Sequence, residues 1–220
     1  QGQCCCPGCV TDMLREGFDP ESEADRIRFA RRTLLNYYRV ITAACRKFNP
    51  DMPVFHNSGH IPRGDREILP YFSHLELESL PTGGWGYDHF PVSAAYCRKL
   101  PFEFIGMTGK FHSTWGEFGG YKHPDALRYE CMAMLANGAR CSIGDQLHPD
   151  ARLDESTYRA IGQAYAEVEA KEAWCIGAES AADIAVLSNS AFHRESTESA
   201  AETGCARILQ EGHLPFDLLD

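Results

Sequence analysis

The chain has 220 residues, of which 44% are hydrophobic and 24% are charged, and its formal net charge is -10. This composition is ordinary for a globular protein, and no apolar stretch approaches the length of a membrane span, so disordered and membrane-spanning classes are excluded. The acidic balance also argues against a nucleic-acid partner, since proteins that bind nucleic acids usually carry a basic surface.

The first predicted element is a long amphipathic helix within residues 19–48. Asp19 is expected at its N-cap, with Pro20 in the first helical position. Apolar residues then recur at spacings of three and four, which places them on one face of a helix. The residues expected on this face are Ile27, Ala30, Leu34, Tyr37, Ile41 and Cys45.

Strand-like and helical patterns alternate over the next part of the chain. Strands that alternate with helices at this spacing indicate parallel βα units, with the helices outside the sheet. Short apolar runs predict strands within 52–58, 71–88, 102–109 and 139–149, and longer periodic segments predict helices over 92–100, 123–138 and 154–174.

The pattern starts again after Trp174. Residues 180–190 are predicted to form an apolar strand, residues 195–213 a helix, and residues 214–220 another strand. A strand, helix and strand in this order predict the beginning of a second α/β domain.

Four βα units make only half of a (β/α)8 barrel, and a half barrel leaves two sheet edges unpaired. The preceding strands are therefore expected upstream of Gln1. We expect an α/β protein in which residues 1–178 form the C-terminal half of a (β/α)8 TIM barrel. Residues 179–220 are expected to begin a flavodoxin-like α/β domain that the chain leaves incomplete.

Polar and aromatic residues gather at the predicted carboxyl ends of the strands, where barrel and open α/β enzymes build their sites. Residues 108–124 are the densest example, and they are expected to form one long βα loop that contributes to a shared pocket. Glycosidases generally use two carboxyl groups, one to protonate the leaving oxygen and one as nucleophile or base. Glu117 on this loop and Glu78 at the end of an earlier strand are the catalytic candidates.

Each candidate also has a structural interpretation. For Glu117 it is a solvent-facing residue in a flexible loop. Glu76 and Glu78 have the same parity on their strand, so both point to one face, where a structural ion pair competes with a functional role. The residues expected to stack on a sugar ring or to bind its hydroxyls, each with a plain hydrogen-bonding role as the alternative, are His56, Asn57, Trp85, Asp88, His89, Lys110, His112, Trp115 and Asp145.

The cysteines divide into two groups. Six of the ten are scattered singly within apolar patterns, which is typical of small buried residues in a reducing, cytoplasmic compartment. The others lie in "CCCPGC", where thiolates at short spacing fit a structural zinc site. The C-x-x-C within this run is alternatively a redox motif, although that needs a thioredoxin-like context.

Several long strings carry a resemblance to a known family. They are "HLELESLPTGGWGYDHFP", "GMTGKFHSTWGEFGGYKHP", "RYECMAMLANGARCSIGDQLHP" and "AYAEVEAKEAWC". These strings resemble a glycoside-hydrolase-like family described as α-L-fucosidase-like, which carries a trimerisation-type domain. The order of a C-x-C-x-x-C cluster, βα units and a further α/β domain also resembles bacterial β-galactosidases. The resemblance covers nearly the whole chain.

The resemblance implies a glycosidase that cleaves a terminal sugar from an oligosaccharide or glycoside, such as an α-L-fucoside or a β-galactoside. It implies a homotrimer at full length, no organic cofactor, and one structural zinc held by Cys4, Cys6 and Cys9. The related families keep one catalytic carboxylate at the end of the fourth strand, which would precede Gln1. The fragment alone is therefore expected to be inactive.

Two other classes remain open at this point. A carbohydrate-binding protein would keep the pocket and lack the chemistry. A metal-dependent hydrolase on the same barrel would need converging ligands, for which His56, His112 and Asp145 are the candidates.

Overall fold

The computed structural model describes residues 3–193 and 199–220. The chain divides into two compact units. The first comprises Gln1–His56 and Glu67–Phe72, and the second comprises Asn57–Arg66 and Ser73–Asp220.

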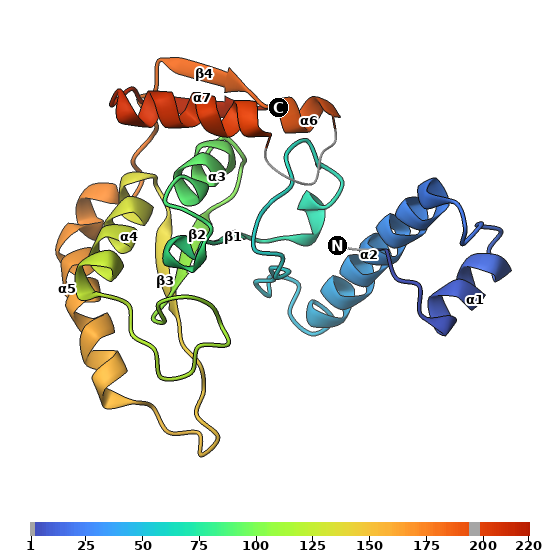
Figure 1. Cartoon of the computed structure of the whole chain (residues 1–220), viewed down its shortest axis with the longest axis horizontal. Helices are drawn as coiled ribbons and strands as arrows, with labels where there is room; N and C mark the ends of the chain where they lie inside the picture. The colour runs from blue at the N-terminus through green and yellow to red at the C-terminus, as the bar shows by residue number, and fades with distance from the viewer. Residues whose placement is uncertain (1–2, 194–198) are drawn as a thin grey trace. The chain divides into compact units, whose positions relative to one another are not determined.

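The first unit is helical. It contains α1 (Pro7–Arg15), α2 (Glu23–Cys45) and the short 3-10 helix η1 (Leu69–Tyr71) (Figure 1). The long helix was predicted correctly, but its start was not. Ser22 is the N-cap, because its hydroxyl accepts a hydrogen bond from the backbone N–H of Asp25.

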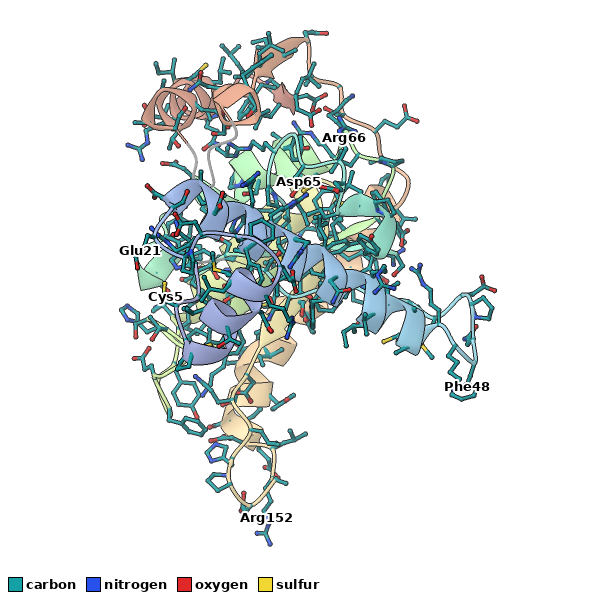
Figure 2. All side chains as sticks on the ribbon, turned by 90° about the vertical axis from the view of Figure 1, so that its right-hand side faces the viewer. Cys5, Glu21, Phe48, Asp65, Arg66 and Arg152 are labelled. Atoms are coloured by element: carbon teal, nitrogen blue, oxygen red, sulfur yellow. The ribbon has the colours of Figure 1, made fainter. Side chains whose placement is uncertain are left out.

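The prediction of which face of α2 is buried is also wrong. Ile27 is 52% exposed and Tyr37 is 50% exposed. The buried residues of the helix are Phe29, Tyr38 and Thr42. The helix carries apolar residues on more than one face, so the periodicity alone did not specify which face is buried. After the helix, Phe48 projects into solvent (Figure 2).

The second unit contains a parallel sheet of three strands in chain order, β1 (Leu75–Glu78), β2 (Phe104–Gly109) and β3 (Arg140–Gly144). These strands confirm three of the predicted ones. The strand predicted over 52–58 is wrong, since those residues form no strand. A strand requires a hydrogen-bonded neighbour as well as an apolar run, and Pro53 lacks the backbone N–H that would contribute to one.

Three helices cover one face of this sheet: α3 (His89–Cys97), α4 (Pro124–Ala136) and α5 (Glu155–Cys175) (Figure 1). Leu75 and Leu77 are almost fully buried, whereas the residues that alternate with them are only partly covered. Gly106 lies under Phe90 of α3 and Met134 of α4, where a β-carbon would come within 2.6 Å of both side chains. The opposite face of the sheet therefore carries the polar residues of β1.

A second pair of parallel strands consists of β4 (Ile184–Leu187) and β5 (Phe216–Leu219). The helices α6 (Asn189–His193) and α7 (Ala200–Glu211) lie between them in sequence. The predicted strands are confirmed, and the predicted helix of residues 195–213 is confirmed from Ala200 onward. Residues 194–198 lie outside the described residues.

Charged pairs join β5, the residue after it and α7 to the rest of the unit. Arg98 of α3 donates from Nε to Oδ1 of Asp217 at 2.6 Å. Arg66, labelled in Figure 2, forms an ion pair with Asp220. Arg63 forms an ion pair with Glu202, and both side chains are at most 6% exposed.

No helix of the described residues combines the length and apolar character needed to cross a membrane.

Candidate active site

The two glutamates of β1 share the sheet face that the helices leave open. Glu76 and Glu78 alternate with the buried Leu75 and Leu77. Burial, and secondarily the negative charge of Glu78, raise the pKa of the Glu76 carboxyl above its usual value. A raised carboxyl pKa is the property that a general acid needs near neutral pH.

Trp115 contacts Glu78 directly, although the two residues are far apart in the sequence. Its indole Nε1 donates a hydrogen bond to Glu78 Oε1 at 2.6 Å. The same indole lies over Gly144 at the end of β3, where a β-carbon would be only 2.3 Å from the ring. The Phe111 ring is 4.8 Å from the Trp115 ring between centroids.

Gly59 lies next to both Glu78 and Trp85. A β-carbon on Gly59 would be within 3.9 Å of both the Glu78 carboxylate and the Trp85 ring. The Trp85 ring is in turn 4.9 Å from the ring of His89, and His89 Nδ1 lies 3.2 Å from the hydroxyl of Ser79. Glu78 therefore lies among aromatic and polar groups.

The loop over residues 108–124 is closed at its base by a buried lysine. The backbone N–H of Lys122 donates to the carbonyl of Lys110 at 2.7 Å. The ammonium group of Lys122 donates to Glu130 Oε2 at 2.7 Å and to the Thr108 hydroxyl at 2.8 Å, and all three side chains are buried. One lysine of this segment thus fixes the loop and does not face a pocket.

A second set of contacts holds the far part of the loop. Gln146, which follows β3, donates from Nε2 to the carbonyl of Trp115 at 2.9 Å and to that of Glu117 at 3.3 Å. The Tyr121 hydroxyl lies 2.6 Å from Ser156 Oγ at the start of α5. These contacts make the Gly-rich segment an anchored loop.

Glu117 accepts hydrogen bonds from the backbone N–H of Ser113 at 2.5 Å and from the Ser113 hydroxyl at 2.8 Å. The N–H contributes most to lowering the pKa of Glu117, followed by the hydroxyl. The side chain also lies against the backbone of Gly120, where a β-carbon would be 2.4 Å away. Glu117 is therefore an ionised carboxylate that bridges its own loop.

Lys110 and Asp145 come together at the ends of β2 and β3. The Lys110 ammonium is 3.6 Å from Asp145 Oδ1 and 5.2 Å from the centre of the Tyr121 ring. Lys110 is only 4% exposed, so the carboxylate partly compensates a buried charge.

The remaining predicted residues lie in different surroundings. Asp88 accepts from Nε of Arg207 in α7 at 2.9 Å, so its carboxylate is already paired. His112 is exposed, and its backbone carbonyl accepts a hydrogen bond from the Thr82 hydroxyl. Asn57 is exposed at the start of the second unit.

His56 is buried in the first unit. Its Nε2 lies 2.9 Å from the Thr42 hydroxyl, and its ring centre is 4.4 Å from that of Tyr38 and 5.3 Å from that of Phe72. Burial lowers the pKa of His56, which favours the neutral imidazole. These contacts are those of a histidine packed in an aromatic core.

The thiols of Cys4, Cys6 and Cys9 form a compact group before and within α1. Their sulfur atoms all lie within 4.8 Å of one another. Zinc–sulfur bonds of about 2.3 Å place the sulfur atoms of a tetrahedral site roughly 3.8 Å apart. The three thiols therefore fit a zinc ion after small rotations, whereas the neighbouring Cys5 is outside the group.

The chain is similar over its whole length to the α-L-fucosidase isoenzyme 2 from Paenibacillus thiaminolyticus. The sequence identity is 52% and the TM-score is 0.92, and the match covers 100% of this chain. The chain therefore resembles one part of an α-L-fucosidase. It spans 34% of the length of that enzyme. No protein-family model and no curated protein sequence matches the chain.

The sequence did not identify three residues that support the candidate site. Gln146 and Ser113 act by anchoring the loop, and no local pattern distinguishes them from other polar loop residues. Lys122 was part of the highlighted loop, but its buried pairing with Glu130 depends on the packing of α4. The anchoring of the loop therefore became visible only in the structure.

Proposed function

We propose that this chain is part of a glycoside hydrolase that removes a terminal L-fucose from an α-L-fucoside. The observation that carries the proposal is the 52% identity and TM-score of 0.92 to an α-L-fucosidase over the whole of this chain. Carboxylates and aromatic side chains at the ends of parallel strands support the same chemistry. A β-galactoside is the second substrate class implied by the sequence resemblance.

The proposed catalytic carboxylates are Glu78 and Glu117. Glu78 faces the open side of the sheet and accepts a hydrogen bond from Trp115. Glu117 has a lowered pKa, and this favours the ionised form that a nucleophile or base requires. Glu76 is a further candidate for holding a proton, because its pKa is raised.

The proposed binding groups divide by chemistry. Trp85 and Trp115 offer exposed aromatic surface for the apolar face of a sugar ring. The hydroxyls of the sugar would form hydrogen bonds with polar side chains. These proposed residues are Asn57, Asp88, His89, Lys110, His112 and Asp145, whereas His56 is left out because its ring is packed against Tyr38 and Phe72.

We further propose that the parallel strands belong to the C-terminal half of a (β/α)8 barrel, over residues 1–178. Three parallel strands in chain order, with helices on one face, support this proposal. Residues 179–220 are proposed to begin a trimerisation-type, flavodoxin-like domain, and the full-length enzyme to be a cytoplasmic homotrimer. A (β/α)8 barrel has eight strands, so a complete active site would also need strands from the rest of the longer enzyme.

Cys4, Cys6 and Cys9 are proposed to hold one structural zinc ion, which would cross-link the start of α1. Their sulfur atoms are close enough to share a metal. Zinc prefers four ligands in such sites, so a fourth ligand would complete the coordination. The ion would contribute folding energy and take no part in the hydrolysis.

The proposal is tested by the hydrolysis of nitrophenyl α-L-fucoside and β-D-galactoside by the longer enzyme that contains this chain. Glu78→Gln and Glu117→Gln should each lower kcat by about 100-fold or more if they act in proton transfer or attack. Glu169→Gln, on the exposed surface of α5, is the matched control. Fucoside hydrolysis that neither Glu78→Gln nor Glu117→Gln reduces would contradict the assigned carboxylates.

A carbohydrate-binding protein is the alternative, supported by the aromatic surroundings of Glu78. It predicts saturable binding of an oligosaccharide without turnover. The metal-dependent hydrolase has less support, because His56 is buried against Thr42 and Tyr38. Among the described residues, the group of potential metal ligands consists of cysteines alone.

A further inference from the structure

Glu78 lies at a position where its carboxylate is constrained from several directions. Its backbone N–H donates to the carbonyl of Gly59 at 2.9 Å. Its side chain lies beside the same glycine and the Trp85 ring, and its Oε1 accepts the Trp115 N–H at 2.6 Å. Of these contacts, the bond from Trp115 is the one that fixes the carboxylate oxygens themselves.

The position of Trp115 is itself fixed by its contacts with the chain at the end of β3. Its ring lies on Gly144, where a β-carbon would be 2.3 Å from Cη2 and 3.1 Å from Cζ2 and Cζ3. Gln146 holds its backbone carbonyl at 2.9 Å, and the Phe111 ring packs beside it. The position of the indole is therefore set by the end of β3, which is a rigid element of the sheet.

We propose that Trp115 is a positioning residue that aims the Glu78 carboxylate, and that Gly144 provides the flat surface that sets the position of the indole. This inference rests on the proposed glycosidase function. It assigns Trp115 a task beyond the proposed stacking on the sugar. The indole N–H is used by Glu78, and one part of the ring lies against the sheet.

The proposed task has a measurable consequence. A carboxylate that attacks or donates a proton must be held close to its productive position, and a misplacement of about 1 Å costs roughly 100-fold in rate. Loss of the indole N–H should therefore reduce kcat more than it changes KM. A stacking platform would show the opposite pattern, because it contributes to substrate binding.

The test uses Trp115→Phe, which removes the N–H and keeps an aromatic ring, and Gly144→Ala, whose β-carbon would displace the indole. Gly162→Ala is the matched control, because nothing lies within 4 Å of a β-carbon there. In the longer enzyme that contains this chain, both site variants should lower kcat by about 10-fold or more, with a much smaller change in KM. A rise in KM at unchanged kcat would overturn the inference.

A double-mutant cycle tests whether Trp115 acts through Glu78. In a Glu78→Ala background, Trp115→Phe should reduce the residual rate no further, since the group that it positions is gone. Independent, additive losses would overturn the inference.

A spectroscopic measurement separates this inference from the proposed function. In the ¹⁵N-labelled protein, the indole resonance that disappears in Trp115→Phe should shift in Glu78→Ala and in Gly144→Ala, and should stay unchanged in Gly162→Ala. A resonance that none of these changes moves would refute the positioning role, even in an active enzyme. An inactive wild-type enzyme with the expected shifts would refute the fucosidase assignment and leave the contact established.

Discussion

The ammonium nitrogen of Lys122 lies 2.7 Å from Oε2 of Glu130, and their side chains are only 1% and 4% exposed. The Thr108 hydroxyl also donates to this carboxylate oxygen, at 2.6 Å. The ion pair links the end of the site loop to α4. A buried pair of this kind is costly to break on one side, because the other charge is left without a partner.

Lys122→Met should lower the free energy of unfolding by about 3–5 kcal/mol, since it leaves the Glu130 carboxylate buried and unpaired. Urea unfolding measures the loss. Lys171→Met is the control, because its pair with Glu167 on α5 is solvent-exposed and should be worth about 1 kcal/mol or less. Equal losses in the two variants would show that burial of the Lys122 pair has no special cost.

The contribution of Glu76 to the free energy of unfolding should decrease as the pH rises. Its pKa is raised in the folded state by burial and by Glu78, so its stabilising contribution is present at acid pH and is lost as the pH rises through the folded-state pKa. The free energy of unfolding of the wild type relative to Glu76→Gln should therefore fall as the pH rises from the ordinary glutamate pKa of about 4.3 through the raised folded-state pKa. Urea unfolding across this range measures it, with Glu169→Gln as the control, and a difference that is flat or rises with pH would contradict the prediction.

Replacing any one of Cys4, Cys6 and Cys9 by serine should reduce the zinc content of the purified protein from about one ion per chain. Elemental analysis measures the metal directly. Cys5→Ser is the control, since Cys5 lies within the same run but outside the thiol group. Zinc loss in Cys5→Ser equal to that in the three others, or no zinc in the wild type, would rule out the proposed ligand set.

Arg98→Met should loosen the β4–β5 pair without opening the three-stranded sheet. Burial disfavours ionisation of Asp217, but hydrogen bonds from Arg98 and Ser180 outweigh it, so the Asp217 pKa is lowered. The stabilisation from this carboxylate is therefore present at neutral pH and is lost as the pH falls through its folded-state pKa. Amide hydrogen exchange should become faster in Phe216–Leu219.

The matched control for this measurement is Arg140→Met, because its pair with Glu103 is exposed on both sides. It should leave the exchange rates of β5 unchanged. Equal exchange in wild type and Arg98→Met would show that the pair does not hold β5 in place.

The helices and the strands of the second unit could be predicted because their apolar patterns match their burial. Leu75 and Leu77 alternate with glutamates, and the alternation is visible in the sequence. The strand expected over 52–58 failed because pairing depends on a neighbour that the pattern does not identify. The prediction of the buried face of α2 failed because Tyr37 and Tyr38 both look suitable in the sequence. The contacts of Tyr38 with Tyr71 and Phe72 decide between them.

The sequence indicated that the candidate residues lie at the ends of strands. It did not indicate which of them form hydrogen bonds with one another. Glu78, Trp115 and Asp145 were identified from their positions after predicted strands. The hydrogen bond between Glu78 and Trp115 spans 37 positions, so no local spacing specifies it. The bond from Gln146 to the Trp115 carbonyl spans 31 positions and is equally invisible in the sequence.

The contact of Trp115 with Gly144 restricts how the two positions can vary during evolution. Any side chain at 144 would occupy the volume of the indole, since even a β-carbon would be 2.3 Å from it. A mutation at 144 is therefore tolerated only after the residue at 115 has become smaller, and a smaller residue there loses the N–H that reaches Glu78. The two codons are expected to change together or not at all.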